Sequence, residues 1–212
     1  MKVELLDHTS HICMIKAIRR CHNSEARSDS DMAIGPNDQD LIRRIIAQGH
    51  TSTLEHLVFV FDIDQLSRAA LQEFARHRIA SPSVKSTRYT MQEIKDARCE
   101  DGIDCGTDRC GMRRFLHESG SEEIDFLNCR QLCGVAGLLH EGLSNDVAKY
   151  GLPEAFRTSL IWTINARSLR NFFTLRSSPR ALREMRHLAD EVFAQIPADY
   201  RFLFEDCMEG EA

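Results

Sequence analysis

Two short apolar segments constrain the fold of this 212-residue chain more than any other feature. Residues 57–63 (LVFVFDI) and 158–164 (TSLIWTI) are rich in β-branched and aromatic residues, which predicts a strand at each. A further strand is expected at 2–6, and residues 86–90 are expected to be extended. Strands do not alternate regularly with the expected helices. The sequence therefore predicts an α+β fold, a single domain over residues 1–212 with a mainly antiparallel sheet flanked by helices.

Helical spacing of apolar residues predicts the helices. The expected ranges are 11–21, 40–48, 66–77, much of 113–142, 145–149 and 166–176. Gly49 is expected to stop the second of these helices. A last long helix is expected to begin with Ser178 and Pro179 as N-cap and first turn. Its apolar positions recur at helical spacing: Leu182, Met185, Leu188, Ala189, Val192 and Phe193.

Composition and charge disfavour several classes of protein. With 42% hydrophobic and 28% charged residues, the chain has ordinary globular composition rather than that of a disordered segment. No apolar run has the length of a membrane span, and the first residues lack a secretory apolar stretch, so a cytoplasmic protein without membrane association is expected. The net charge is −5, whereas a general nucleic-acid binder is usually basic. The clustered arginines therefore favour a small anionic ligand over nucleic acid.

Three of the eight cysteines lie in the least regular stretch of the sequence, residues 96–111. These three are Cys99, Cys105 and Cys110. They could bind a metal, but their spacing fits no zinc pattern, and a structural loop is favoured. Cys129 and Cys133 are one helical turn apart and are expected in the core. We therefore expect no metal and reduced thiols throughout, and the role of 96–111 stays open.

A basic segment begins at Arg76-His77-Arg78 and runs to Tyr89. On a helix, two arginines two residues apart point about 200° away from each other, so they would serve two anions or two parts of one site. Pro82 stops the helix, and the Ser, Lys and Arg side chains that follow offer donors for a phosphate. The alternative is a solvated basic helix end that complements the helix dipole.

The turn at residues 50–56 (HTSTLEH) combines two histidines with a carboxylate. Metal binding by His50, Glu55 and His56 is one interpretation. The spacing is not that of the HExxH helix, however, and a glycine stop precedes the segment, so a hydrogen-bonded turn is favoured.

The segment at residues 165–176 (NARSLRNFFTLR) is an amphipathic helix with several arginines. Its polar face holds Arg167, Arg170, Asn171 and Thr174, at positions i, i+3, i+4 and i+7. Arg176 instead continues the apolar stripe. An inward-facing guanidinium needs an anionic or hydrogen-bonding partner, so it belongs either to a structural ion pair or to a ligand site.

These three segments together resemble the flavin-dependent thymidylate synthase family. Arg76-His77-Arg78, seven further residues and then Ser86 match its RHR-x7-S signature, and Arg88-Tyr89 continues the match. The HTSTLEH turn and the NARSLRNFFTLR helix are similar to two other segments of that family, in the same order. The resemblance covers roughly residues 5–205. The SPSVKSTRYT and INARSL stretches are most similar to the epsilonproteobacterial type.

The resemblance implies reductive methylation of dUMP to dTMP. It implies methylenetetrahydrofolate as carbon donor, FAD as cofactor, NADPH as its reductant, and a homotetramer with sites at subunit interfaces. By position, the implied FAD-binding residues are Ser52, Arg76, His77, Arg78, Asn165, Arg167 and Asn171. The implied dUMP-binding residues are Glu73, Arg76, Ser86, Thr87, Arg88, Lys149 and Arg176. Arg176 matches the catalytic arginine that activates the uracil.

The chain departs from the family pattern just before Ser86. Many members have an Asn-Glu pair there, whereas this chain has Ser83 and Val84 followed by Lys85. Because Val84 offers no carboxylate, we expect Lys85 and Arg88 to take a larger part in holding the dUMP phosphate. Lys149 stands where many members have arginine, which replaces a bidentate grip by a point charge. Two alternatives remain open: a nucleic-acid-binding protein that uses the arginine-rich segments, and a metal-dependent nucleotide hydrolase that uses the HTSTLEH turn.

Overall fold

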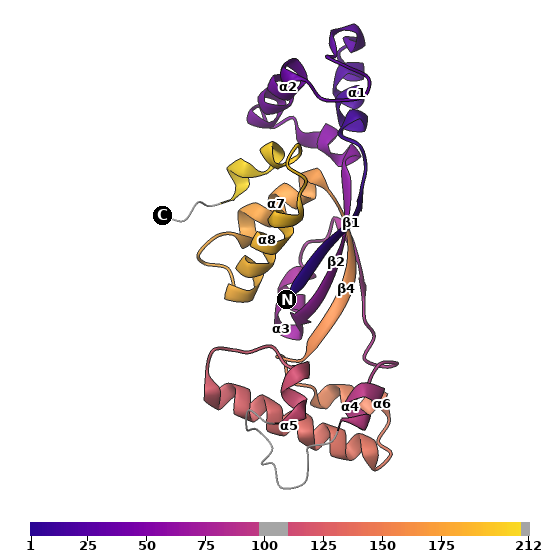
Figure 1. Ribbon diagram of the computed structural model, residues 1–212, viewed down its shortest axis with the longest axis vertical. Coiled ribbons are helices and arrows are strands. Elements are labelled where there is room, and N and C mark those ends of the chain that lie inside the picture. Colours follow the sequence, from indigo (N-terminus) through magenta and orange to yellow (C-terminus); the bar gives the residue numbers. More distant parts are fainter. Residues whose placement is uncertain (98–109, 209–212) are drawn as a thin grey trace. The chain divides into compact units, whose positions relative to one another are not determined.

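A computed structural model of the protein describes residues 1–97 and 110–208 (Figure 1). The strands are β1 (Lys2–His8), β2 (Val58–Ser67), β3 (Ala80–Val84) and β4 (Arg157–Asn165). The α-helices are α1 (His11–Cys21), α2 (Pro36–Ala47), α3 (Arg68–Phe74), α4 (Gln92–Asp96), α5 (Glu122–His140), α6 (Asn145–Ala148), α7 (Ala166–Arg176) and α8 (Arg183–Gln195). Short 3-10 helices are η1 (Glu25–Arg27), η2 (Thr51–His56), η3 (Gly111–Phe115), η4 (Lys149–Gly151), η5 (Arg201–Leu203) and η6 (Glu205–Cys207).

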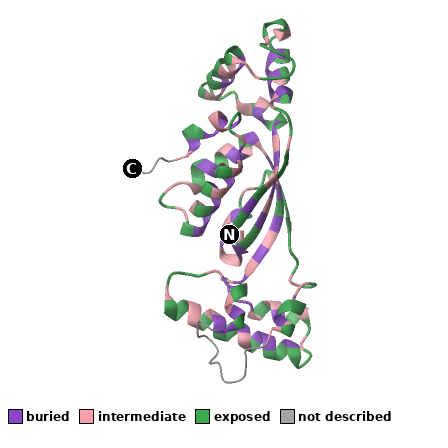
Figure 2. Cartoon of the chain, in the orientation of Figure 1, coloured by how far each residue is buried: buried purple, intermediate pink, exposed green. Residues whose placement is uncertain are grey.

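The four strands form one antiparallel sheet in the order β1-β2-β4-β3, which confirms the predicted α+β class. Burial alternates along β2 and β4, as expected for strands with one covered face (Figure 2). The extended segment expected at 86–90 is wrong. The strand β3 comes earlier, and after it Tyr89 N–H donates to the Ser86 carbonyl over 3.1 Å in a turn. Pro82 lies within β3, which is an edge strand, where proline is tolerated.

Two predicted helices have the expected bounds, and both have side-chain caps. Helix α1 begins after Ser10, whose hydroxyl accepts from the N–H of Ile12. Helix α7 begins after Asn165, whose side chain accepts from the N–H of Ser168 over 2.9 Å. Helix α2 begins four residues earlier than expected, with Pro36 in its first turn. It ends as predicted before Gly49, which has φ +75.

Two predicted helix boundaries are wrong, and the prediction that residues 113–142 are mainly helical is confirmed. The helix expected at 66–77 is only α3, because β2 continues to Ser67, whose hydroxyl accepts from Ala70 N–H over 3.0 Å. The 113–142 segment divides into η3 and α5. Ser178 and Pro179 form a turn, in which Ala181 N–H donates to the Ser178 carbonyl over 2.9 Å, and the N-cap of α8 is Leu182.

The chain forms two compact units, and each contains several segments of the sequence. One unit comprises Met1, Asp64–Phe74 and Ser83–Leu160, and the other Lys2–Ile63, Ala75–Pro82 and Ile161–Ala212. We call them the helical unit and the aromatic-core unit, from the cores described below. Across the described residues, no helix is both long and apolar enough to cross a membrane.

The aromatic-core unit is built on large buried side chains from β2, β4 and the C-terminal helices. Trp162 contacts Phe61 and Phe172, with ring centroids 6.0 and 5.0 Å apart. Phe173 contacts Phe204 at 5.5 Å. Helix α8 packs against α7 and β1 and buries its apolar stripe: Met185, Leu188, Ala189, Val192 and Ile196. Most of the stripe that the sequence predicted on this helix is therefore absorbed within the unit, whereas Phe193 is half-buried and Leu182 is 46% exposed.

The helical unit has a separate core around α5. Helix α5 packs against α4, η3, α6 and η4. Its buried residues are Cys129, Leu132, Val135, Ala136 and Leu139. They cluster with Met91, Ile94, Cys110, Met112, Leu116, Ala148, Leu152 and Phe156. This core depends on one long helix, since each of its neighbours is at most five residues long.

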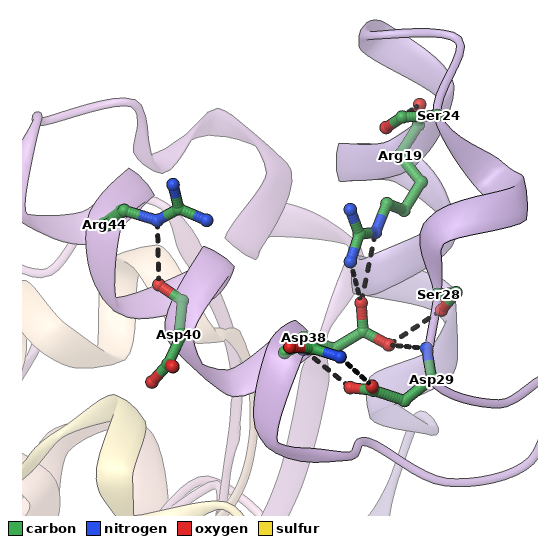
Figure 3. Close-up of polar contacts among 8 residues, drawn as sticks. Arg19, Ser24, Ser28, Asp29, Asp38, Asp40 and Arg44 are labelled. Atoms are coloured by element: carbon green, nitrogen blue, oxygen red, sulfur yellow. Dashed lines mark hydrogen bonds and ion pairs between the residues drawn. The ribbon is translucent and has the colours of Figure 1, made fainter.

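A buried ion pair joins α1 to the start of α2 (Figure 3). Arg19 donates to one Asp38 carboxylate oxygen from Nε over 3.1 Å and from Nη2 over 2.5 Å. The other oxygen accepts from the Ser28 hydroxyl over 2.7 Å and from Asp29 N–H over 3.0 Å. Although burial by itself raises the pKa of Asp38, the bonds from Ser28 and Arg19 outweigh burial and lower that pKa.

Candidate functional site

A cavity of about 580 Å³ lies within the aromatic-core unit. Its lining comes from η2, from the segment that follows α3 and from the N-terminal half of α7: Thr51, Glu55, Arg76, His77, Arg78, Ile79, Arg167, Ser168, Arg170 and Asn171. The volume is within the range of about 300–1,000 Å³ that is typical of small-molecule sites. The positive end of the α7 dipole also lies here and favours an anion.

Two arginines in this cavity have no partner from the described part of the chain. Arg76 and Arg78 are exposed, and neither forms a hydrogen bond or ion pair with any described residue. Because α3 ends at Phe74, the two are not held on opposite sides of a helix, and both line the same cavity. On a continuous helix the two side chains would point about 200° away from each other, but that geometry does not apply here. Both guanidiniums are available to an anionic ligand.

The α7 arginines, in contrast, are paired with residues distant in sequence. Arg167 donates to Glu55 over 2.6 Å. Arg170 makes two bonds of 2.6 Å to Asp206 and a third to the Leu203 carbonyl. Burial by itself lowers the pKa of Arg170, but the hydrogen bond to Asp206 and the charges of Cys207 and Asp206 together outweigh burial and raise that pKa. Arg170 is thus held in an ion pair with Asp206.

Arg176 lies at the end of α7, half-buried, beside His77. Its Nε donates to His77 Nε2 over 2.9 Å. Since Nε2 accepts this bond, it carries no proton, and the neutral imidazole has its proton on Nδ1. The imidazole also lies edge-on to Phe172, with ring centroids 5.1 Å apart. The histidine of the RHR segment therefore orients the arginine that the sequence singled out as catalytic.

The chain matches known proteins over nearly its whole length. The sequence profile of the family described as thymidylate synthase complementing protein matches residues 4–198. A flavin-dependent thymidylate synthase of Wolinella succinogenes is 46% identical over 212 residues, which cover 100% of both chains. The chain belongs to the flavin-dependent thymidylate synthase family.

Other members of this family are also similar to this chain over nearly the full length of both. The flavin-dependent thymidylate synthase of Campylobacter jejuni is 44% identical over all of this chain and 99% of its own. The crystal structure of Helicobacter pylori thymidylate synthase X with FAD and dUMP has a TM-score of 0.89 at 41% identity, covering 99% of this chain and 100% of that one. Identity to the Geobacter sulfurreducens enzyme is lower, at 34%. The predicted resemblance to the epsilonproteobacterial type is confirmed.

The structure brings most of the residues that the family resemblance assigns to FAD into the one cavity. Arg76, His77, Arg78, Arg167 and Asn171 all line it. Two others do not: Asn165 caps α7 through Ser168 N–H, and Ser52 is exposed, next to the cavity residue Thr51.

Sequence reasoning did not assign Thr51, Glu55, Ile79, Ser168 or Arg170 to this cavity. The i, i+3, i+4 spacing of Arg167, Arg170 and Asn171 on one face of α7 could have indicated that Arg170 lines the same cavity as the other two. Ser168 lies beside Arg167 in the sequence. The Glu55 pair had no signal, because it spans 112 positions.

The residues assigned to dUMP fall in both units. Arg76 and Arg176 belong to the aromatic-core unit. The helical unit contains Glu73, Lys85, Ser86, Thr87, Arg88 and Lys149. The Ser86 carbonyl accepts from the Thr90 hydroxyl over 2.9 Å as well as from Tyr89 N–H. Ser86 therefore closes a compact turn around Thr87 and Arg88.

Within the helical unit, the two cations of this set near Ser86 have acidic partners. Arg88 donates to both carboxylate oxygens of Asp146, over 2.7 and 3.5 Å. Lys85 lies 3.7 Å from Glu93 and lines a cavity of about 570 Å³ with that residue. Lys149 is half-buried, and its side chain forms no hydrogen bond or ion pair with the described residues. An anionic substrate would have to compete with Asp146 for Arg88, whereas Lys149 needs no such exchange.

The turn at residues 50–56 forms η2, and its carboxylate pairs with an arginine. Among residues 1–97 and 110–208, the one group of three potential metal ligands with donor atoms close together is Cys110, Cys129 and Cys133. The three residues proposed for a metal-dependent hydrolase, His50, Glu55 and His56, make no such group in that part of the chain. Cys99 and Cys105 lie outside the described residues.

Proposed function

We propose that the chain methylates dUMP to dTMP, with methylenetetrahydrofolate as carbon donor, FAD as cofactor and NADPH as reductant. The observation that carries the proposal is the cavity at the start of α7, where Arg76 and Arg78 lack partners among the described residues. It lies in a chain that belongs to the flavin-dependent thymidylate synthase family. The Helicobacter pylori relative was crystallised with FAD and dUMP.

FAD fits the chemistry of this cavity. Its pyrophosphate needs cationic and N–H donors, which two guanidiniums and a helix N-terminus supply. Its flavin and adenine rings are flat and largely apolar, and Ile79 offers an apolar contact. We propose that Ser52, Arg76, His77, Arg78, Asn165, Arg167 and Asn171 bind FAD. Asn165 acts by fixing the first turn of α7, and Arg167 donates where Glu55 leaves its guanidinium accessible.

Arg176 is the catalytic residue in this proposal. Carbon 5 of the uracil must become nucleophilic, so negative charge develops around nitrogen 3 and the neighbouring carbonyl oxygens. A guanidinium held in place before the reaction stabilises that charge without having to reorganise. The bond to His77 fixes the orientation of the Arg176 guanidinium through its Nε. When bound and reduced by NADPH, FAD would supply a hydride to the transferred carbon, and this chain contributes orientation and charge.

The remaining substrate residues are proposed to hold dUMP, chiefly by its phosphate. They are Glu73, Arg76, Lys85, Ser86, Thr87, Arg88 and Lys149. The hydroxyls of Ser86 and Thr87 are suitable donors, and the lysines add charge. Because Arg88 is paired with Asp146, phosphate binding exchanges one anion for another at this guanidinium. Before the substrate binds, the ion pair with Asp146 keeps the Arg88 side chain ordered.

We also propose that residues 1–212 act as one catalytic domain, and that the enzyme is a cytoplasmic homotetramer with sites at subunit interfaces. The family profile spans both units, which supports a single domain. The tetramer rests on the family resemblance alone, because most of the apolar stripe of α8 is buried within its own unit.

The direct test is to purify the protein and measure its flavin and its reaction. We expect a yellow protein that releases FAD on heating or acidification. We expect dTMP from dUMP only when methylenetetrahydrofolate and NADPH are both present. A colourless protein that takes up no added FAD would overturn the proposal, and so would a protein that holds FAD but forms no dTMP.

Shared sites can be tested by mixing two inactive variants, Arg88→Ala and Arg176→Ala. If one chain supplies Arg88 and another supplies Arg176, a mixed pair has one site that lacks both arginines and one that has both. Co-expressed variants should then regain part of the wild-type activity. Native mass spectrometry establishes that mixed oligomers have formed. Mixed oligomers without activity would contradict the shared site.

A further inference from the structure

Three cysteine side chains converge in the core of the helical unit. The Sγ atoms of Cys110, Cys129 and Cys133 all lie within 4.8 Å of one another, and those of Cys110 and Cys133 are 3.5 Å apart. Cys129 and Cys133 share one face of α5 because they are four residues apart. Cys110 comes from a different element, since it immediately precedes η3. Segments 19 residues or more apart in sequence thus present thiols to one point.

The sulfur spacing suits a common metal ion better than a disulfide. A Zn–S bond is about 2.3 Å, so two sulfurs of a tetrahedral site are about 3.8 Å apart. A disulfide needs about 2.05 Å. The 3.5 Å between the Sγ atoms of Cys110 and Cys133 is close to the tetrahedral value and exceeds the S–S bond length, and no pair of the three sulfurs is more than 4.8 Å apart. We propose that Cys110, Cys129 and Cys133 bind a structural zinc ion in the helical unit, and that a ligand beyond these three completes its coordination.

Burial and ligand chemistry favour zinc in a structural role. Cys129 is fully buried, Cys110 is 3% exposed, and Cys133 is half-buried, as in a closed structural site rather than an open catalytic one. Thiolates are soft ligands, which select zinc over the hard cations magnesium and calcium. On binding, each thiol gives up its proton and becomes a thiolate. From the sequence alone, Cys110 was expected in a structural loop and Cys129 and Cys133 in the core. Their spacing in the sequence gave no sign that the three thiols lie together in the folded chain.

The helical unit also has a physical need for such a link. Its core is made by one long helix with neighbours of at most five residues. Small cores bury too little apolar surface to be stable by themselves, and a structural metal is one of the standard ways to reinforce them. A zinc ion between Cys110 and α5 would fix the chain before η3 onto the long helix.

Metal content of the full-length protein tests the proposal. We expect about one zinc per chain by elemental analysis of wild type expressed with zinc in the medium. Cys129→Ser and Cys133→Ser should lose the zinc. The matched controls are Cys13→Ser, at an exposed thiol, and Cys207→Ser, at a buried thiol of the other unit. Both controls should keep it.

A second measurement separates a metal from ordinary packing. A strong zinc chelator should lower the melting temperature of wild type, whereas Cys133→Ala should start lower and respond little to the chelator. Cys133 is chosen because it is half-buried, so its truncation leaves a smaller cavity than a change at Cys129. If the serine variants fail to fold, wild type with and without chelator still decides.

Three results would overturn the proposal. The first is wild type without zinc whose melting temperature ignores the chelator. The second is iron in place of zinc. The third is a chain whose mass is lower by two hydrogens before reduction, with the disulfide mapped to this cluster.

Discussion

The α1–α2 region and the α7 cavity use the same side chain in opposite ways. Arg19 is buried and forms an ion pair with the Asp38 carboxylate. That carboxylate also accepts hydrogen bonds from the Ser28 hydroxyl and the Asp29 N–H (Figure 3). Arg76 and Arg78 are exposed and have no hydrogen-bonding or ionic partner in the described chain. The first arrangement is complete without a ligand, whereas the second is complete only with an anion.

The difference separates stability from binding. Removing one partner from a buried ion pair leaves an uncompensated charge, so the cost is a cost to folding. Removing an exposed guanidinium costs folding little and costs the ligand a charge-assisted bond. The comparison therefore predicts different phenotypes for changes in the two regions.

The largest expected effect is on folding, in the Asp38→Ala variant. It leaves Arg19 buried without its carboxylate, and we expect a loss of about 3–5 kcal/mol in the free energy of unfolding. Urea denaturation measures it, and FAD affinity of the protein that remains folded should not change. The control is Asp40→Ala, because Asp40 is exposed and lies 3.5 Å from Arg43 in a surface pair. Equal stability of the two variants would contradict the structural role of Asp38.

The next effect is on turnover, in the Arg176→Ala variant. Loss of one preorganised charge stabiliser should lower kcat by about a hundredfold or more, while the protein stays folded and keeps FAD. Arg180→Ala, at an exposed position four residues later, is the control and should keep normal activity. Turnover near wild type would show that another arginine activates the uracil. An unfolded Arg176→Ala protein would assign this residue to stability instead.

Lys85 is intermediate between the paired Arg19 and the unpaired Arg76 and Arg78. Its side chain is partly exposed and lies 3.7 Å from Glu93. Lys85→Ala should weaken dUMP binding by about tenfold, roughly the value of one charge-assisted bond at an exposed site, and leave the FAD content unchanged. Calorimetric titration with dUMP measures this effect. Lys95→Ala removes the same charge from α4 outside the proposed site and serves as control. Unaltered dUMP affinity in Lys85→Ala would refute the role given to Lys85.

The smallest expected effect is a pH-dependent one at the Arg170–Asp206 pair. The hydrogen bond from Arg170 lowers the pKa of Asp206 in the folded protein. Below the unfolded value of about 3.9, the unfolded carboxyl binds more protons than the folded one, so stability falls as pH decreases. The contribution is present above that value and is lost as pH falls through the lower folded pKa.

Asp206→Asn should therefore flatten the acid limb of the stability curve. Near neutral pH it should cost at most about 1 kcal/mol, because Asp206 is largely exposed. Thermal melts from pH 7 to pH 2 measure both quantities. An unchanged acid limb would show that the pair contributes no stability.

Local signals in the sequence predicted local structure well. Helix α7 was predicted to the residue from its apolar spacing, and the structure adds a side-chain cap at Asn165. The strand β3 was missed because Pro82 is usually a strand breaker and is tolerated here only at a sheet edge. The N-cap assigned to Ser178 failed because that residue forms a turn of its own.

Contacts between segments distant in sequence could not be predicted from the sequence. The family motifs identified Arg76, Arg78 and Arg176, but their pattern does not tell which arginines the chain itself pairs. Arg167 and Arg170 find carboxylates 112 and 36 positions away. Only the folded chain shows that these two are paired, whereas the side chains of Arg76 and Arg78 have no partner among the described residues.

The central claim is that these two unpaired arginines bind FAD, and one titration tests it most directly. FAD dissociation constants are compared for wild type, for Arg76→Ala/Arg78→Ala, and for Arg43→Ala/Arg44→Ala, which removes two exposed arginines of α2. Loss of two charge-assisted bonds should weaken FAD binding by at least about a hundredfold in the first double variant, with little change in melting temperature. The second double variant should bind FAD as wild type does. Wild-type affinity in Arg76→Ala/Arg78→Ala, or an equal loss in both, would contradict the account.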